Sequence, residues 1–313
     1  MELEAAKIGV LAGGVSGERE ISLLSAKAAF EALKRCNLNV IFIDICTSDK
    51  KEVKNLIVSY GVDLVFIALH GKFGEDGQIQ KILEELDIPY TGSGSKASFL
   101  AMDKILSKDI FLKFGVSTPN YIVCSQREDV PKDLRYPAVV KPHFSGSSLG
   151  VSIVKEDGAL GPALDEAFSY QDKLIVEDYI EGRELTVGIL AGIPLPVVEI
   201  VPREGFYDFN TKYSDTDCPE YISPAKLDPT IYRQVQEAGL SAHKALGCRH
   251  FSRVDIRLGL DNIPYVLEVN SIPGLTSHSL LPLAAGVYGI SFDGLILKMV
   301  ELALYGKKTA QKI

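Results

Sequence analysis

The chain has 313 residues, enough for about two or three domains, and its 46% hydrophobic and 24% charged residues are the balance of an ordinary globular protein. Its net charge of -8 disfavours non-specific nucleic-acid binding, and its five scattered cysteines contain no CxxC pair, which argues against a disulfide framework or a zinc ribbon. Without a secretory signal or an apolar run near the roughly 20 residues of a membrane span, the chain is expected to be cytoplasmic and to contact neither membrane nor nucleic acid.

Strands and helices alternate through the first third of the sequence. We predict strands over residues 7–12, 40–45 and 63–69, and helices after the glycine-rich stretch 13–17, over 49–59 and over 77–86. In the first of these helices, Ile21, Leu24, Ala28 and Leu33 lie close to one stripe, which is expected to face the core. The alternation predicts a parallel sheet with helical crossovers, ending at a flexible, hinge-like stretch at 92–94.

The rest of the chain predicts further helices and strands in a mixed order. Expected helices cover 97–102, 104–114, 159–168 and 229–246, with two more at the C-terminus, and expected strands cover 121–124, 138–141, 151–154, 174–177, 184–190, 197–201, 252–258 and 264–269. Residues 203–218 form a long polar stretch without clear periodicity. Loops of that length in compact domains are usually functional or disordered, so this stretch is a candidate functional loop.

Two short strands near the C-terminus carry the strongest local signal. Arg253 and Asp255 are spaced i, i+2, as are Glu268 and Asn270, so each pair shares one face of its strand. The hairpin-like link at 259–262 would bring the two pairs together. Two carboxylates and an amide oxygen are ligands suited to Mg²⁺. The alternative is an antiparallel hairpin with one polar, solvated face.

Three loop signals point to small ligands. Lys141 ends an apolar strand just before the small-residue loop 143–150, whose backbone N–H groups could cradle phosphates; alternatively, the loop is only a turn. Glu18 follows a glycine loop and is placed to bind an ammonium, or merely favours the dipole of the helix that it begins. His70 ends a parallel strand, where side chains face the ligand crevice, unless it is bonded to a nearby carbonyl.

Together these signals indicate one reaction class. Lysines, a glycine loop and an oxygen-ligand Mg²⁺ site suggest ATP, and no Ser/His/Asp or Cys/His arrangement suggests a protein nucleophile. Arg253 beside the metal site would stabilise developing negative charge. Phosphoryl transfer to a carboxylate, followed by attack of an amine, would use all of these parts.

The sequence also resembles the D-alanine–D-alanine ligases of the ATP-grasp superfamily, from residue 8 to about residue 304. The resemblance rests on motifs in the family's order: GGVSGEREISL (13–23), FIALHGKFGEDG (66–77), PYTGSGSKAS (89–98), MDK (102–104), VVKPHFSGSSLGV (139–151), FYDFNTKY (206–213), RVDIR (253–257) and LEVNSIPGLTSHSLLP (267–282). One departure is the HFS that precedes GSS in the glycine loop. The resemblance implies an N-terminal Rossmann-like domain (1–94) followed by two ATP-grasp subdomains (95–183 and 184–313).

The resemblance further implies a role for each matching residue. At ATP, the phosphates would be contacted by Lys104, Lys141 and Lys212, the adenine by Glu177 and Ile180, and the ribose by Glu184. Two Mg²⁺ (or Mn²⁺) ions would be held by Asp255, Glu268 and Asn270.

The same resemblance implies the substrate contacts. Glu18 would bind the ammonium of the first D-alanine within a network that includes Ser147 and Tyr213, with His70 nearby. The oxyanion site would consist of Arg253 and the N–H of Gly274, and the carboxylate of the second D-alanine would be received by Ser279 and Leu280.

The implied reaction forms an acyl phosphate on the first D-alanine, which the amine of the second then attacks, in a step of peptidoglycan precursor synthesis. Residues 203–218, which carry Lys212 and Tyr213, would form the lid, and a homodimer is implied. A tyrosine at position 213 goes with the dipeptide product. The alternatives are a D-alanine–D-lactate or D-alanine–D-serine ligase, and a non-catalytic nucleotide-binding module on the same fold.

Overall fold

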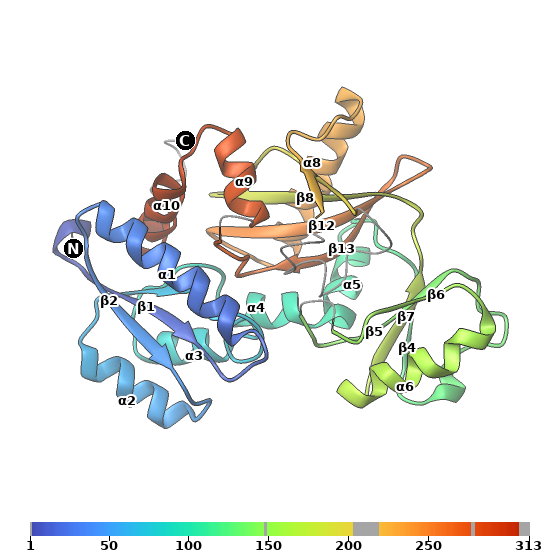
Figure 1. The fold of residues 1–313 in the computed structure, drawn as a ribbon, viewed down its shortest axis with the longest axis horizontal. Coiled ribbons are helices and arrows are strands. Elements are labelled where there is room, and N and C mark those ends of the chain that lie inside the picture. The colour runs from blue at the N-terminus through green and yellow to red at the C-terminus, as the bar shows by residue number, and fades with distance from the viewer. Residues whose placement is uncertain (1, 147–148, 203–218, 277–278, 307–313) are drawn as a thin grey trace.

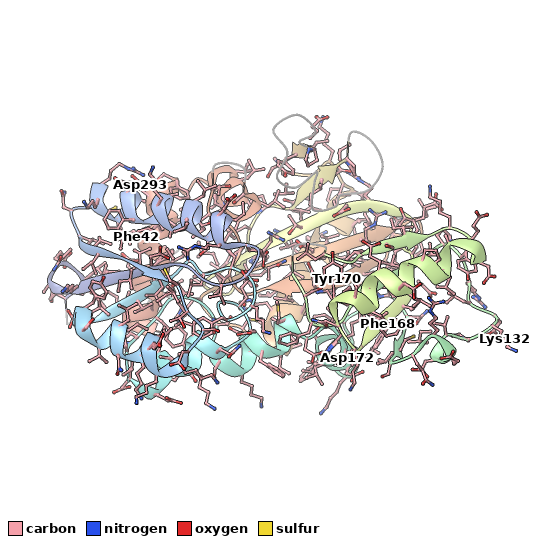
Figure 2. The ribbon with its side chains drawn as sticks, turned by 60° about the horizontal axis from the view of Figure 1, so that its bottom comes forward. Phe42, Lys132, Phe168, Tyr170, Asp172 and Asp293 are labelled. Carbon is pink, nitrogen blue, oxygen red and sulfur yellow. The ribbon has the colours of Figure 1, made fainter. Side chains whose placement is uncertain are left out.

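The computed structural model describes residues 2–146, 149–202, 219–276 and 279–306. Its strands form three sheets with helices packed on them, which confirms the predicted mixture of α/β and α+β structure. Figure 1 shows the N-terminal sheet in blue on one side, the central sheet in green on the other, and the C-terminal sheet in yellow and orange between them. In Figure 2, Phe42 lies in the N-terminal unit and Lys132 lies in the central unit, toward opposite ends of the long axis.

The N-terminal sheet is parallel, as predicted, with strand order β2-β1-β3. Its strands are β1 (Lys7–Gly13), β2 (Asn39–Ile45) and β3 (Leu64–Ile67), and its helices are α1 (Arg19–Arg35), α2 (Lys50–Tyr60) and α3 (Gln78–Glu85), after a 3-10 turn at Leu3–Ala5. β3 ends two residues before the predicted end at residue 69. Ala68 N still bonds to Leu11 O, and Leu69 stays buried as loop, so an apolar run alone could not mark where the strand stops.

The buried face of α1 differs from the predicted stripe. Leu24 is 56% exposed, and Ile21 and Ala28 are only partly buried. The residues that α1 buries are almost all small, namely Ser22, Ser25, Ala26, Ala29, Ala32 and Leu33. Small side chains let a helix approach a sheet closely, so the contact face of α1 follows residue size more than hydrophobicity.

The stretch at 92–94, which its composition predicts to be a flexible hinge, is bonded to a distant residue of the C-terminal unit. Ser93 is buried, and its Oγ accepts a hydrogen bond from Arg249 N at 3.2 Å. The Arg249 guanidinium donates to Gly92 O at 3.1 Å and lies over the Tyr90 ring. These contacts come from a residue more than 150 positions away, and local composition carries no sign of them.

The central sheet is antiparallel, with strand order β4-β7-β5-β6. Its elements are β4 (Tyr121–Cys124), β5 (Ala138–Pro142), β6 (Ser152–Val154), β7 (Leu174–Asp178) and α6 (Leu160–Tyr170), with 3-10 turns at Arg127–Asp129 and Asp157–Ala159. α6 packs its apolar side on the sheet around Ala163, Leu164 and Ala167. Tyr170, at the end of α6 in Figure 2, lies against Gly150 and so anchors the end of the 143–150 loop.

The C-terminal sheet runs β11-β10-β8-β12-β13, with β9 added to β8. Its strands are β8 (Gly182–Leu190), β9 (Ile193–Pro194), β10 (Val198–Val201), β11 (Glu220–Ile222), β12 (Phe251–Gly259) and β13 (Pro264–Asn270). The short strands β9 and β11 were not predicted, whereas the predicted helices and strands that fall on described residues end within two residues of their predicted bounds. All strand pairs in this sheet are antiparallel.

Helices cover both faces of the C-terminal sheet. They are α4 (Ser95–Met102), α5 (Lys104–Lys113), α8 (Pro229–Ala245), α9 (Leu280–Val287) and α10 (Phe292–Tyr305). α4, α5 and α8 share one apolar cluster with β8, β12 and β13, while α9 and α10 join the cluster beneath α1. The division at 94/95 and 183/184 stays a prediction.

Among the described residues, no single helix has both the length and the hydropathy of a membrane span. The pair α9 and α10 meets that test only when taken together, across a bend of 104°.

Candidate active site

Two adjoining pockets lie where the central and C-terminal sheets face each other. The larger, which we call the large cleft, includes among its lining residues Lys104, Lys141, Glu177, Ile180, Glu184, Asp255 and Glu268. The smaller, which we call the small cleft, is lined by residues that include Glu75, Gly146, Asn270 and Ser271. Lys104, Ser145 and Glu268 line both, so the two clefts meet at a lysine and a carboxylate.

The hairpin of β12 and β13 brings the two predicted pairs together. Arg253 is opposite Asn270, and Asp255 is opposite Glu268. The register shifts just after Asp255, which leaves Leu267 unpaired and adds it to the wall of the large cleft. Such bulges are common next to active sites, where they redirect side chains. The predicted convergence of these four polar side chains on one face is therefore present.

Asp255 accepts several hydrogen bonds at the site. Arg253 donates to it from both Nε (2.9 Å) and the terminal nitrogen (2.7 Å). Thr186 Oγ1 donates at 2.7 Å and Asn270 Nδ2 at 3.0 Å. A bidentate guanidinium contact fixes both the position and the plane of the carboxylate. The face is thus a bonded polar network and not a loosely solvated one.

The chemistry of this face fits divalent cations with hard oxygen ligands. Asp255 and Glu268 already hold cations of the protein, since Arg253 pairs with the first and Lys104 Nζ lies 3.2 Å from the second. Asn270 uses its amide N–H toward Asp255, which turns its carbonyl oxygen to other partners. Among the described residues no three His, Cys, Asp or Glu side chains gather as a metal site. Two carboxylates and an amide suit Mg²⁺, which commonly completes its shell with water and phosphate oxygens.

Lys104 joins three parts of the site. Asp103 caps α5 by accepting from Ile105 N and Leu106 N, which places Lys104 at the first turn. The Lys104 side chain is 6% exposed, and its Nζ donates to Ser145 O at 2.5 Å. Lys104 therefore connects α5 to the 143–150 loop and to Glu268 of β13.

Glu177 lies between two lysines. Lys141 Nζ, from β5, donates to Glu177 Oε1 at 2.6 Å, and Lys108 Nζ, from α5, lies 2.9 Å from Oε2. Burial works against the charged carboxylate, but Lys141 and then Lys108 outweigh it and hold the pKa of Glu177 below its ordinary value. Glu177 thereby holds Lys141 at the wall of the large cleft.

Arg257 organises the far end of the large cleft. Its guanidinium donates to Ile180 O at 3.1 Å and to Gly182 O at 3.0 Å, and it pairs with Glu184 at 3.4 Å. It also lies over the Tyr179 ring, 5.5 Å from the centroid. Ile180 and Glu184, two of the predicted nucleotide contacts, are thus fixed side by side.

Glu18 points toward Gly146, in the 143–150 loop that follows β5 of the central sheet. It is the residue before α1, yet its side chain does not cap the helix. A Cβ on Gly71, whose φ is +71°, would lie 2.2 Å from Glu18 Oε2, and one on Gly146 would lie 3.5 Å from the same atom. Glycines at both positions leave room for this carboxylate. The contact favours the ligand-facing interpretation of Glu18 over the dipole one.

His70 is buried and bonded on both sides. Its Nδ1 lies 3.2 Å from Glu75 Oε1 and its Nε2 lies 3.0 Å from Ser25 Oγ. Ser25 Oγ in turn accepts from Leu275 N at 3.2 Å. The partners of the ring are a carboxylate and a hydroxyl, not the carbonyl that the simpler alternative proposed. His70 is thereby linked to the loop that carries Gly274.

The loop before α9 brings Gly274 next to Ser279. A Cβ on Gly274 would lie 2.9 Å from Ser279 Oγ, which accepts a hydrogen bond from Thr276 N at 2.9 Å. Leu280 is 5% exposed and packs in the core, so its backbone, and not its side chain, is the part suited to a carboxylate. Ser147, Lys212 and Tyr213 lie outside the described residues.

Comparison with known proteins places this geometry in a family. The family models for the N-terminus and C-terminus of D-Ala-D-Ala ligases match residues 47–93 and 110–301. The chain is 45% identical to the D-alanine–D-alanine ligase of Syntrophotalea carbinolica, over 96% of each chain, and 44% identical to that of Citrifermentans bemidjiense, over 96% of this chain and 97% of the relative.

The chain belongs to the D-alanine–D-alanine ligase family.

Solved structures of the family have the same fold. The ligase of Bacillus anthracis covers 97% of this chain and 99% of its own, with a TM-score of 0.86 at 36% identity, and its complex with ATP gives 0.83 at 34%. The VanG D-Ala:D-Ser ligase of Enterococcus faecalis gives 0.80 at 32% identity and covers 95% of this chain and 99% of its own. These neighbours confirm the expected ATP-grasp fold with its N-terminal parallel sheet.

Several residues of this family member's site were not predicted. Lys108, Glu75, Ser25 and Arg257 contact predicted residues directly. A signal existed for two of them, because Lys108 is four residues after Lys104 on a helix and Arg257 is two after Asp255 on a strand. Each therefore shares a face with a predicted residue. Ser25 depends on contacts with distant segments and carries no comparable signal. Glu75 is only five residues after His70, but it lies in a turn, where no helix or strand spacing sets the direction of a side chain.

Proposed function

We propose that this chain joins two D-alanine molecules with ATP, through an acyl phosphate, to give D-alanyl-D-alanine, ADP and phosphate. The observation that carries the proposal is the junction of the two clefts at Lys104 and Glu268, which suits a nucleotide on one side and an amino-acid carboxylate on the other. Family membership over nearly the whole chain supports the same reaction. Phosphoryl transfer needs such positioning and charge neutralisation more than a protein nucleophile.

ATP would occupy the large cleft. Lys104 and Lys141 would contact its phosphates, with Lys212 added from the 203–218 loop acting as a lid. At the other end, Ile180 and Glu184 are held together by Arg257 and would meet the adenine and the ribose. Glu177 would lie at the adenine through its place in the cleft wall, while it also holds Lys141.

Asp255, Glu268 and Asn270 would hold two Mg²⁺ (or Mn²⁺) ions. When bound, the ions would neutralise charge on the phosphates during transfer. Arg253 and Lys104, which pair with the two carboxylates, would then turn to other anions at the site. For Arg253 that anion would be the negative charge that develops on the reacting carboxyl group.

The first D-alanine would bind in the small cleft. Glu18 would pair with its ammonium in a network with Ser147 and Tyr213, while His70, fixed by Glu75 and Ser25, would close one wall. Its carboxylate oxygen would attack the γ-phosphorus of ATP, and ADP would leave. Exclusion of water during this step protects the acyl phosphate from hydrolysis.

The second D-alanine would bind beside the start of α9. Ser279 and the backbone of Leu280 would receive its carboxylate, since a helix N-terminus attracts anions. Its amine would attack the acyl carbon, and the Arg253 guanidinium and the Gly274 N–H would stabilise the oxyanion. Phosphate would leave with one oxygen of the first carboxylate.

The cellular setting follows from this reaction. We propose that the dipeptide serves peptidoglycan precursor synthesis, that the protein works as a homodimer, and that it works in the cytoplasm, where ATP is available. The described cysteines, Cys36, Cys46, Cys124 and Cys248, are all free thiols, as suits a reducing compartment.

A product assay tests the proposal. Purified protein with Mg²⁺-ATP and D-alanine should release ADP and phosphate and form D-alanyl-D-alanine, each in equal amounts. ATP consumption that does not depend on D-alanine would refute it, and nucleotide binding without turnover would favour a non-catalytic module.

A second candidate is ligation of D-alanine to D-serine or D-lactate. The structural likeness to a D-Ala:D-Ser ligase favours including it. Competition between D-alanine, D-serine and D-lactate at neutral pH decides between them. The tyrosine at position 213 predicts that the D-alanine dipeptide dominates.

A further inference from the structure

Lys108 lies directly behind the large cleft. It is on α5, one turn after Lys104, and its side chain is 0% exposed. Its Nζ lies 2.9 Å from Glu177 Oε2 and donates to Thr118 Oγ1 at 2.6 Å. Thr118 Oγ1 donates in turn to Val266 O of β13 at 2.8 Å. The ammonium is therefore fixed between α5, β7 and β13, while the cleft wall itself is made by its partner Glu177 and by Lys141.

The three charged groups carry one net positive charge. Glu177 forms ion pairs with both lysines. Its Oε1 lies 2.6 Å from Lys141 Nζ and its Oε2 lies 2.9 Å from Lys108 Nζ. If Glu177 had Lys141 as its single partner, the two would form a neutral pair at the cleft wall. The second lysine offsets the carboxylate, so the charge of Lys141 remains available to an anion in the cleft.

Stability alone does not account for a second buried lysine. Buried ion pairs add little to stability, and apolar residues of similar volume often replace them at no cost. Burial lowers the pKa of Lys108 to about 8, although Glu177 works in the opposite direction, so the environment opposes the charge that the site contains. Buried charges kept against such a cost are candidates for function.

We propose that Lys108 is a positioning residue that offsets the charge of Glu177 and thereby lets Lys141 act on the phosphates of the nucleotide. The inference rests on the proposed function only in taking the ligand of the large cleft to be an adenine nucleotide.

Direct binding of ADP, measured by calorimetry without D-alanine, tests the proposal. Lys108→Met removes the charge and keeps the volume, and Lys108→Arg keeps the charge. Lys113→Met, at the exposed end of the same helix, is the matched control. Lys108→Met should weaken ADP binding by roughly tenfold, as expected for one unit of charge near the phosphates. Lys108→Arg should stay within about threefold of the parent, Lys113→Met should be unchanged, and KM for D-alanine should change little in all three.

A double variant separates charge from structure. Lys108→Met with Glu177→Gln returns the net charge of the group to that of the parent, and should bind ADP more tightly than Lys108→Met alone. A purely structural lysine would give the reverse, because the double variant loses two buried contacts in place of one. Equal ADP affinity in Lys108→Met and the parent, or a double variant no tighter than Lys108→Met, would overturn the proposal.

The unmodified protein offers a measurement that does not depend on a variant folding. ADP affinity should fall as pH rises through about 8, because Lys108 loses its proton while facing Glu177, Lys141, Lys104 and the ring of Tyr121. An affinity that stays constant across that range contradicts the proposal. A parent protein that binds no adenine nucleotide refutes both this inference and the proposed function, whereas ADP binding without dipeptide formation refutes the function alone.

Discussion

Arg253 pairs with the Asp255 carboxylate in this structure, and during the reaction it would stabilise the negative charge that develops on the substrate. It grips Asp255 through two nitrogens, and it is 18% exposed, so it is fixed but reachable. We predict that Arg253→Ala lowers kcat by about two orders of magnitude or more and changes KM far less, because the developing charge loses its donor. Steady-state kinetics measure this. Arg127→Ala, which removes an exposed pair with Asp165, is the control, and an unchanged kcat in Arg253→Ala would refute the role.

Glu18 allows a second prediction for a single side chain. Glu18→Gln keeps the shape of the group that faces Gly71 and Gly146 but removes its charge. KM for the first D-alanine should rise roughly tenfold, because the ammonium loses its counter-charge, while KM for ATP changes little. Glu20→Gln, exposed on the first turn of α1, is the matched control. D-alanine kinetics identical to those of the parent would count against the assignment.

Individual site residues were predictable where a strand or helix sets their direction. Asp255, Glu268 and Asn270 were found from the i, i+2 pairs Arg253/Asp255 and Glu268/Asn270, and the ladder places Asp255 opposite Glu268 and Asn270 opposite Arg253. Contacts between distant segments could not be predicted in this way, because they follow no local spacing in the sequence. The bonds from Ser25 to His70 and to Leu275 join parts of the chain up to 250 residues apart, so no local pattern contains them.

At the scale of elements, the close packing of α1 on its sheet leads to a stability prediction. Ala29 is fully buried on the contact face, whereas Leu24 is 56% exposed on the other. Ala29→Leu should destabilise the fold by about 1–3 kcal/mol, because the added atoms have no space. Leu24→Ala should change the free energy of unfolding by less than about 0.5 kcal/mol. Urea unfolding of both variants checks the contrast, and the opposite ranking would restore the stripe that hydrophobicity alone suggested.

The order and type of the elements followed from apolar runs, glycines and helical spacing, and the parallel N-terminal sheet followed from their alternation. The sequence did not predict the features that depend on tertiary contacts. β9 and β11 are too short to show a period, and the 92–94 stretch is tethered by Arg249 although its composition indicates a hinge. The helices α2 and α5 begin directly after Asp49 and Asp103, whose side chains accept the capping hydrogen bonds.

At the scale of the whole molecule, a buried histidine, His243, and a partly buried one, His250, link stability to pH. Burial lowers the pKa of His243 and of His250 from 6.5 to about 4. Between these values the unfolded chain binds more protons than the folded one, so the free energy of unfolding falls as the pH falls through this window. The urea midpoint should therefore drop between about pH 7 and about pH 5. His243→Gln should show a smaller drop, and equal drops in parent and variant would show that His243 does not contribute.

The central claim is that this molecule activates the carboxylate of one D-alanine as an acyl phosphate inside a closed site. Incubation with Mg²⁺-ATP and D-alanine labelled with ¹⁸O in its carboxylate tests it directly, with mass spectrometry of the released phosphate. One ¹⁸O atom should appear in each phosphate formed, since the carboxylate oxygen that attacks phosphorus leaves with it. Dipeptide formation accompanied by phosphate that carries no ¹⁸O would contradict the account.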